Sequence, residues 1–306
     1  MILCAGESLI DMVPEGGAFR PLVGGAVYNT AIALGRLGVP SAYLWPISRD
    51  PFGEMLLRPL AEAGVDTGLC PRSDRPTTLA FVTLTGGEAR YSFYDEGSAG
   101  RMLAPADLPR IPDTVSALFI GGISLVPDPC GAAVEALVDR LRNRVPVMID
   151  PNIRPFFIAD PEAYRARLDR LIGKADLLKL SADDLEWLMP GKTFAEAAAH
   201  YLSHGVRAVF QTGGAEGATA HWRDAPVSAP ALRVEVADTI GAGDTFNAGV
   251  LASLHQSGAL SREGLARLTP DQLAAALAMG TRTAAITVSR PGANPPWAHE
   301  LAALPA

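Results

Sequence analysis

The segment DTIGAGDTFNAGVLASL contains an acidic residue at a point where chemistry on an anion is feasible. A Gly-Ala-Gly turn at residues 241–243 leads directly into a helical pattern that begins near Asp244. Main-chain N–H groups and the positive end of a helix dipole attract negative charge, so this turn is a candidate site for a phosphate. We expect Asp244 to face a cleft there as a general base. The structural alternative is that Asp244 is simply the N-cap of the helix.

The elements that position this turn follow from the periodicity of the chain. Apolar, strand-like runs alternate with stretches of helical spacing, and these runs are ILCAGESLIDMV, SAYLWPIS, ALFIGGISL, PVMIDPN, DLLKLS and AVFQTGG. This alternation predicts an α/β domain in which helices cover both faces of a mainly parallel sheet. Ligands bind such sheets beyond the carboxyl ends of the strands. Asp11, at the end of the first predicted strand, is one residue so placed.

One segment departs from this alternation. TLAFVTLT and EARYSFY are two alternating runs joined by Gly86 and Gly87, which predicts an antiparallel hairpin. With the short extended stretch 11–22, the segment 76–104 would form a small β-lid on a core of residues 1–10, 23–75 and 105–306. A hairpin with one apolar face must cover something. Both the substrate and a partner subunit, as in a homodimer, meet that requirement.

Composition argues against several function classes. The 306 residues are 48% hydrophobic, enough for one large globular domain. A net charge of −7 disfavours a general nucleic-acid or membrane-surface binder, because either would present positive charge to phosphates. No apolar run approaches the roughly 20 residues of a membrane span. The three cysteines lie far apart and suggest neither a disulfide framework nor a metal knuckle, so we expect a cytoplasmic protein.

Other motifs carry less weight. His200 and His204 lie one helical turn apart, but no third metal ligand accompanies them, and a surface position is the simpler interpretation. The sequence contains no GxxxxGK[ST] motif, and no GxGxxG motif follows the first strand. A P-loop kinase and a nicotinamide-dependent oxidoreductase are therefore both disfavoured.

Two motifs together resemble a known family. DTIGAGDTFNAG is similar to the second signature of the ribokinase-like (PfkB) carbohydrate kinases, and GGAVYNTAIALGRLG resembles their N-terminal diglycine motif. The two occur in the expected order, and the resemblance extends over essentially the whole chain. It implies a ribokinase-like three-layer α/β/α fold and an ATP-dependent sugar kinase in which Asp244 is the catalytic base.

The same resemblance implies roles for further residues. Main-chain amides at Gly241, Ala242 and Gly243 would stabilise charge on the moving phosphoryl group. The residues implied for the sugar are Asp11, Gly24, Gly25, Asn29, Tyr91, Phe93 and Arg154. The residues implied for ATP are Lys179, Thr212, Gly214, Gly217, Gly243 and Asn247. The aromatic pair could equally be packing residues of the hairpin.

Metal contacts are implied less directly. The family commonly has Asn-x-x-Glu where this chain has Ser181-Ala-Asp-Asp184, and Asp184 keeps a carboxylate that could hold Mg²⁺ through water. Ser181 and Asp184 also have the spacing of a helix capping box, which remains the alternative. A potassium ion would be held by Asp238 and by carbonyl groups near Ile240 and Gly292.

The acceptor sugar is expected to be fructose. The segment YSFYDEGSAGRML resembles the fructokinase branch, and Ala26 stands where ribokinases have a lysine. Acidic residues at 95 and 96 occupy positions where 2-keto-3-deoxygluconate kinases tend to carry arginine. That acid, or a nucleoside, remains the alternative acceptor. A catalytically silent sugar sensor is the remote alternative, since such a protein would lack the acid after the Gly-Ala-Gly turn.

Overall fold

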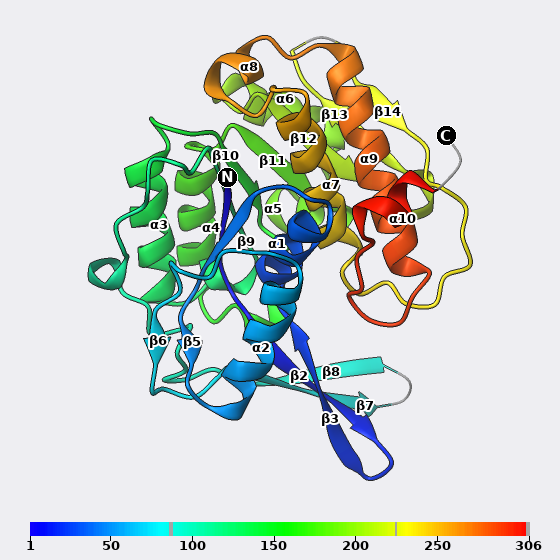
Figure 1. Cartoon of the computed structure of the whole chain (residues 1–306). Coiled ribbons are helices and arrows are strands. Elements are labelled where there is room, and N and C mark those ends of the chain that lie inside the picture. Colours follow the sequence, from blue (N-terminus) through cyan, green and yellow to red (C-terminus); the bar gives the residue numbers. More distant parts are fainter. Residues whose placement is uncertain (86–87, 224, 304–306) are drawn as a thin grey trace.

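The computed structural model describes residues 1–85, 88–223 and 225–303. A central sheet of eight strands has the order β14-β13-β12-β11-β10-β9-β1-β4 (Figure 1). Strands β12 through β4 run parallel to their neighbours, whereas β13 and β14 extend the sheet antiparallel. The bounds are β1 Ile2–Ala5, β4 Ser41–Leu44, β9 Ala117–Gly121, β10 Val147–Asp150, β11 Leu177–Leu180, β12 Ala208–Thr212, β13 Ala218–His221 and β14 Val227–Ala229.

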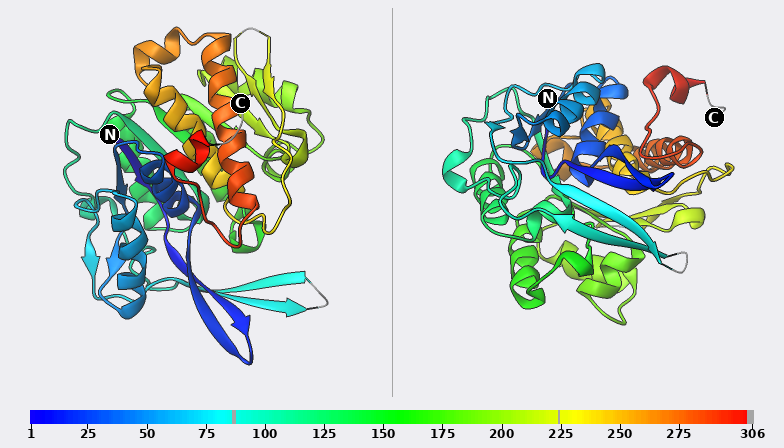
Figure 2. Two further views of the ribbon diagram at one scale, coloured as in Figure 1. Left: turned by 45° about the vertical axis from the view of Figure 1, so that its right-hand side comes forward. Right: turned by 90° about the horizontal axis from the view of Figure 1, so that it is seen from below.

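Helices cover both faces of this sheet. On one face α7 contacts both α1 and α9, and α3 and α4 lie on the other face, as the view from below shows (Figure 2). The bounds are α1 Ala26–Arg36, α2 Pro51–Glu62, α3 Cys130–Leu141, α4 Pro161–Ile172, α5 Ala182–Leu188, α6 Phe194–Ser203, α7 Ala242–Gln256, α8 Arg262–Ala266, α9 Pro270–Val288 and α10 Ala298–Ala302. The expected three-layer α/β/α class is confirmed.

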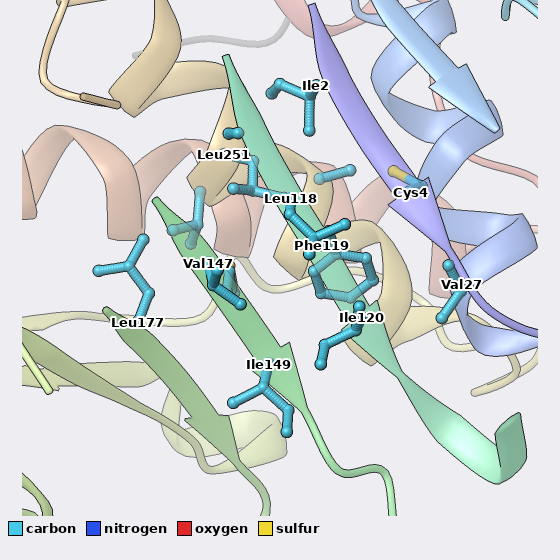
Figure 3. Close-up of a cluster of buried hydrophobic side chains, with 14 of the residues drawn as sticks. Ile2, Cys4, Val27, Leu118, Phe119, Ile120, Val147, Ile149, Leu177 and Leu251 are labelled. Atoms are coloured by element: carbon cyan, nitrogen blue, oxygen red, sulfur yellow. The ribbon is translucent and has the colours of Figure 1, made fainter. Parts of the chain in front are cut away.

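The core lies between these layers. Ile2, Phe119 and Val147 come from three neighbouring strands, and Val27 and Leu251 reach them from α1 and α7 (Figure 3). All five side chains are almost completely buried. Strands covered on both faces need apolar residues at nearly every position, which explains why the sequence shows them as continuous apolar runs.

Helices α7 and α9 cross at two glycines. A Cβ atom on Gly249 would lie 2.7 Å from the Cα atom of Gly280, and one on Gly280 would lie 2.7 Å from the Phe246 ring. Real Cβ atoms do not approach so closely, so hydrogen is the only substituent that fits at either position. This close crossing fixes the position of α7, the helix that carries Asp244.

A second sheet projects from the body with strand order β3-β2-β7-β8 (Figure 1). It consists of two antiparallel hairpins joined by a parallel pairing of β2 with β7. The bounds are β2 Leu9–Glu15, β3 Ala18–Gly24, β7 Leu79–Thr85 and β8 Glu88–Tyr94. We call this four-stranded sheet the lid. The turn expected at Gly86 and Gly87 lies outside the described residues.

Two expected strands are interrupted. The opening run is not one strand, because β1 ends at Ala5 and the chain enters the lid with β2. Between them the carboxylate of Glu7 turns inward to accept main-chain hydrogen bonds. Asp11 therefore lies within β2 and not at the end of the first strand. The run SAYLWPIS is likewise divided at Pro46, which has no N–H to donate, into β4 and β5 (Ile47–Ser48), and β5 pairs with β6 (Arg72–Ser73).

Among the helices of the described ranges, none has both the length and the apolar character needed to cross a lipid bilayer.

Candidate active site

Asp244 lies in the first turn of α7, directly after the Gly-Ala-Gly turn. The N-cap of the helix is Gly241, whose left-handed backbone (φ 79°) suits glycine, and no side chain caps this end. The Asp244 carboxylate accepts a hydrogen bond of 2.8 Å from Asn29 Nδ2. The main-chain carbonyl oxygen of Asp244 accepts a hydrogen bond from the hydroxyl of Thr30. Asp244 is therefore not the N-cap, and α1 holds its carboxylate in place.

Burial changes the acidity of Asp244. The residue is 7% exposed, and burial raises its pKa to about 7, although the hydrogen bond from Asn29 opposes the rise. Arg154 is close enough to lower the pKa of this carboxyl somewhat. A pKa near neutrality suits a group that takes a proton from an alcohol and later releases it. The carboxylate is largely enclosed by the protein, and the expectation that it faces a cleft stays a prediction.

The diglycine segment passes close to the end of β1. Gly25 has φ 120°, and a Cβ atom there would lie 2.4 Å from the carbonyl oxygen of Glu7. The Glu7 carboxylate accepts the N–H of Ala26, the first residue of α1, and the N–H of Ser124. Glu7 thus joins the start of α1 to the loop after β9. The requirement for glycine at position 25 is steric, as the sequence motif indicated.

Asp11 extends from β2 beside Gly24. A Cβ atom on Gly24 would lie 2.5 Å from Asp11 Oδ2, so glycine makes the room that this carboxylate occupies. Burial raises the pKa of Asp11 to about 6. Within the described residues, no hydrogen-bond donor or cation pairs with Asp11. A half-buried carboxylate with unused acceptors is suited to sugar hydroxyl groups, which are donors.

A buried ion pair lies next to the Gly-Ala-Gly turn. Lys179 Nζ is 3.2 Å from Asp150 Oδ2, and Asn247 Nδ2 donates to the same oxygen at 2.7 Å. Burial alone would lower the pKa of Lys179, but the carboxylates of Asp150 and Asp184 together raise it, so the amine stays charged. A Cβ atom on Gly243 would lie 3.2 Å from Nζ. The turn therefore has an ammonium group beside it.

Asp184 is used as a helix cap. Its Oδ2 accepts hydrogen bonds from the N–H and hydroxyl of Ser181, and its Oδ1 accepts the N–H of Ile153 at 2.7 Å. This is the capping box that the sequence left open as the alternative to a metal contact. Among the described residues no cluster of three or more His, Cys, Asp or Glu side chains has the arrangement of a metal site. A water-mediated magnesium contact of Asp184 stays a prediction.

The remaining implied residues form two further groups. Asp238 accepts the N–H groups of Ile240 and Gly292 at 3.0 and 2.9 Å, so its side chain joins the two segments implied for potassium. Thr212 ends β12, and the turn after it contains Gly214 and Gly217, both with positive φ. The main-chain hydrogen bonds of this turn connect its own residues, as between the N–H of Gly213 and the carbonyl oxygen of Gly217 at 2.8 Å. The amide of Ala242 is partly engaged, because it donates to Thr239 at 3.3 Å.

Two hydrophobic side chains of the lid reach the body of the molecule. Tyr91 and Phe93 of β8 stack on Phe156, which follows Arg154 by two residues. Arg154 itself is exposed, and its Nη1 donates to the carbonyl of Ile153. The structure thus brings strand β8 of the lid next to the segment that contains Arg154 and Phe156.

Comparison with known proteins agrees with this geometry. The model of the pfkB family carbohydrate kinases matches residues 1–300. The chain belongs to this family. It is 48% identical over 278 residues to fructokinase of Rhizobium leguminosarum bv. trifolii, covering 89% of this chain and 85% of that protein.

Solved structures of the family have the same fold as this kinase. The fructokinase with bound ATP from Xylella fastidiosa matches it with a TM-score of 0.90 at 29% identity, covering 98% of this chain and 96% of the other. A fructokinase double mutant from Vibrio cholerae O395, in a form with fructose, ADP and potassium ion bound, matches with a TM-score of 0.84. The latter likeness, at 24% identity over 95% and 93% of the two chains, concerns the fold alone.

Sequence reasoning missed three residues of this kinase site. Asp150, Glu7 and Thr30 were not among the candidates, although each makes a hydrogen bond or ion pair that positions a candidate residue. Asp150 ends a buried apolar strand, a position that could have identified it. Glu7 and Thr30 carry no comparable signal, because their roles depend on segments remote in sequence.

Proposed function

We propose that this kinase is a fructokinase, which transfers the γ-phosphoryl group of ATP to a primary hydroxyl group of fructose. The observation that carries the proposal is the buried Asp244 carboxylate, held by Asn29 at an uncapped helix N-terminus. The 48% identity to a fructokinase supports the choice of sugar. The fructokinase structure with bound ATP supports the choice of phosphoryl donor.

The residues divide the reaction between them. Asp244 accepts the proton of the sugar hydroxyl group while the oxygen of that hydroxyl forms the new bond to phosphorus. The bond from phosphorus to the departing ADP oxygen breaks. Asn29 keeps the carboxylate oriented during this transfer. The ammonium of Lys179, which lies beside Gly243, and the first-turn amide of Gly243 would stabilise negative charge on the moving phosphoryl group.

Metal ions fit this scheme as companions of the nucleotide. Mg²⁺ commonly binds the phosphates of ATP and keeps several waters, so it needs few protein ligands. We expect Asp184 to contact Mg²⁺ through water, with carboxylate lone pairs that the helix cap does not use. Asp238 with the carbonyl groups near Ile240 and Gly292 is the proposed potassium site.

The proposed setting is the cytoplasm, with a homodimer formed through the lid. All three cysteines are free thiols, as a reducing compartment would maintain them. Phe81 pairs with Met12, the neighbour of Asp11, so it lies on the lid face opposite to Asp11. Phe19 and Tyr94 pack against Phe81 and are 43% and 65% exposed. This apolar face is the one that a second copy would cover.

A sugar panel tests the acceptor. Purified protein with ATP and Mg²⁺ is assayed for ADP release on fructose, ribose, 2-keto-3-deoxygluconate and a nucleoside. We expect kcat/KM for fructose to exceed that for every other acceptor by at least about tenfold, which corresponds to ~1.4 kcal/mol. A higher value for the keto-deoxy acid would show that the acceptor assignment is wrong. Sugar binding without turnover on any acceptor would indicate a sensor.

A further inference from the structure

Four aromatic rings join the lid to the body of the kinase. Tyr91 and Phe93 belong to β8, and Phe156 and Phe157 belong to the short 3-10 turn η3 (Pro155–Phe157) that follows Arg154. Tyr91 and Phe156 stack with centroids 5.6 Å apart and planes 6° apart. Phe93 lies 5.9 Å from Phe156 and meets the edge of Phe157 at 5.0 Å. We call these four residues the aromatic clasp.

The clasp is not part of the hydrophobic core. Phe156 is 58% exposed and Tyr91 is 42% exposed, values that are high for large apolar side chains. Each aromatic pair contributes attraction beyond the area that it buries. Since so much of the Phe156 and Tyr91 rings remains in water, this contribution favours docking of the lid more than stability of the whole fold.

The clasp connects directly to the proposed sugar site. Across the lid, Phe93 pairs with Ala80, Ala80 pairs with Asp11, and Asp11 pairs with Leu22. Residues paired directly across a sheet project from the same face, so Phe93 and Asp11 share the inner face of the lid. Anchoring the Phe93 ring to η3 therefore anchors the row of residues that carries Asp11. On the body side of this contact, η3 directly follows Arg154.

We propose that Phe156 is a positioning residue for sugar binding, which holds the Asp11 row of the lid at a fixed separation from the Arg154 loop. It acts through Tyr91 and Phe93 and need not touch the sugar itself. The inference rests on the proposed function, since it assumes that Asp11 and Arg154 contact the acceptor. Beyond the proposed sugar contacts, Phe156 would determine the fraction of molecules in which the lid is docked and the sugar site is complete.

Phe156→Ala tests this inference. Loss of two stacked pairs lowers the fraction of molecules with a docked lid, and apparent affinity falls in proportion to that fraction. We expect the KM for the sugar to rise about tenfold, whereas kcat and the KM for ATP change by less than about threefold. Phe156→Tyr keeps the ring and should remain within about twofold of wild type. Met55→Ala, which removes an apolar side chain that is also partly exposed, is the matched control.

Amide hydrogen exchange supplies a readout independent of catalysis. Without sugar, Phe156→Ala should accelerate exchange in β8 and leave β9 unchanged, because only the lid is released. Unchanged KM and unchanged β8 exchange in this variant would overturn the inference, as would a Tyr variant as impaired as the Ala variant. If wild type phosphorylates a sugar other than fructose, the proposed acceptor fails, yet the exchange result still decides whether the clasp holds the lid.

Discussion

The proposed catalytic role of Asp244 comes with a cost in folding free energy. A carboxyl group whose pKa rises from 3.8 to about 7 on folding holds its proton more tightly in the native state. As pH rises between these two values, the unfolded chain ionises first, so the free energy of unfolding falls. Above pH 7 the full cost of an ionised, buried carboxylate is present. The proposed base therefore destabilises the kinase at neutral and higher pH.

Asp244→Asn should separate these two effects. Asparagine can still accept the hydrogen bond from Asn29, but it cannot take a proton, so we expect kcat to fall by at least about 10²-fold while ATP and sugar still bind. At pH 8 its melting temperature should exceed that of wild type. Calorimetry and steady-state assays measure both effects. Near-normal turnover in this variant would refute the assignment of the base.

The pH profile of the wild type offers a second check at the same residue. A base must be ionised to accept a proton, so if Asp244 is the base, log kcat/KM should rise with pH through an acid limb whose midpoint lies near 7. Asp11, with a pKa of about 6, would steepen the lower part of that limb. A profile that is flat between pH 5 and pH 8 would contradict the proposed role of Asp244.

At the scale of elements, the crossing of α7 and α9 determines where Asp244 can be. Gly249→Val would place side-chain atoms inside the backbone of α9, and overpacking of this kind costs about 1–3 kcal/mol. Alanine is a weaker test, because it regains roughly 1 kcal/mol of helix propensity. Denaturant unfolding should show the loss of stability, and kcat should fall as α7 shifts.

Gly68→Val is the matched control for this substitution. The atom nearest to its added Cβ is the end of the Asp66 side chain, which can move away. A Gly249→Val variant as stable as the control variant would show that α7 and α9 can separate without cost.

The elements also show what sequence reasoning could and could not reach. Asp244 and the diglycine were predictable because each depends on a local pattern, a tight turn followed by a helix. The Ser181–Asp184 cap was equally local and was named as an alternative. The opening run was predicted as one strand ending near Asp11, and this was wrong because the interruption at Glu7 depends on contacts with Ala26 and Ser124. Such contacts leave no periodic trace in the chain.

At the scale of the whole molecule, the outer face of the lid bears on oligomeric state. If a second copy covers Phe19, Phe81 and Tyr94, sedimentation should show a dimer at micromolar concentration. Tyr94→Asp would place a charge in that apolar contact and should shift the protein to monomer. Met55→Asp, a comparable change on α2, should leave the dimer intact. A wild type that sediments as a monomer would exclude this assembly.

The bond between Asn29 and Asp244 spans 215 positions of the chain. During synthesis, helix α1 with Asn29 is therefore made long before the proposed base Asp244, and the lid strands are complete well before α7 is made. Catalytic competence is consequently a late event in chain growth. A nascent or truncated polypeptide that ends before the Gly-Ala-Gly turn would contain the lid and Asn29 but not Asp244. We expect such a polypeptide to leave ATP intact.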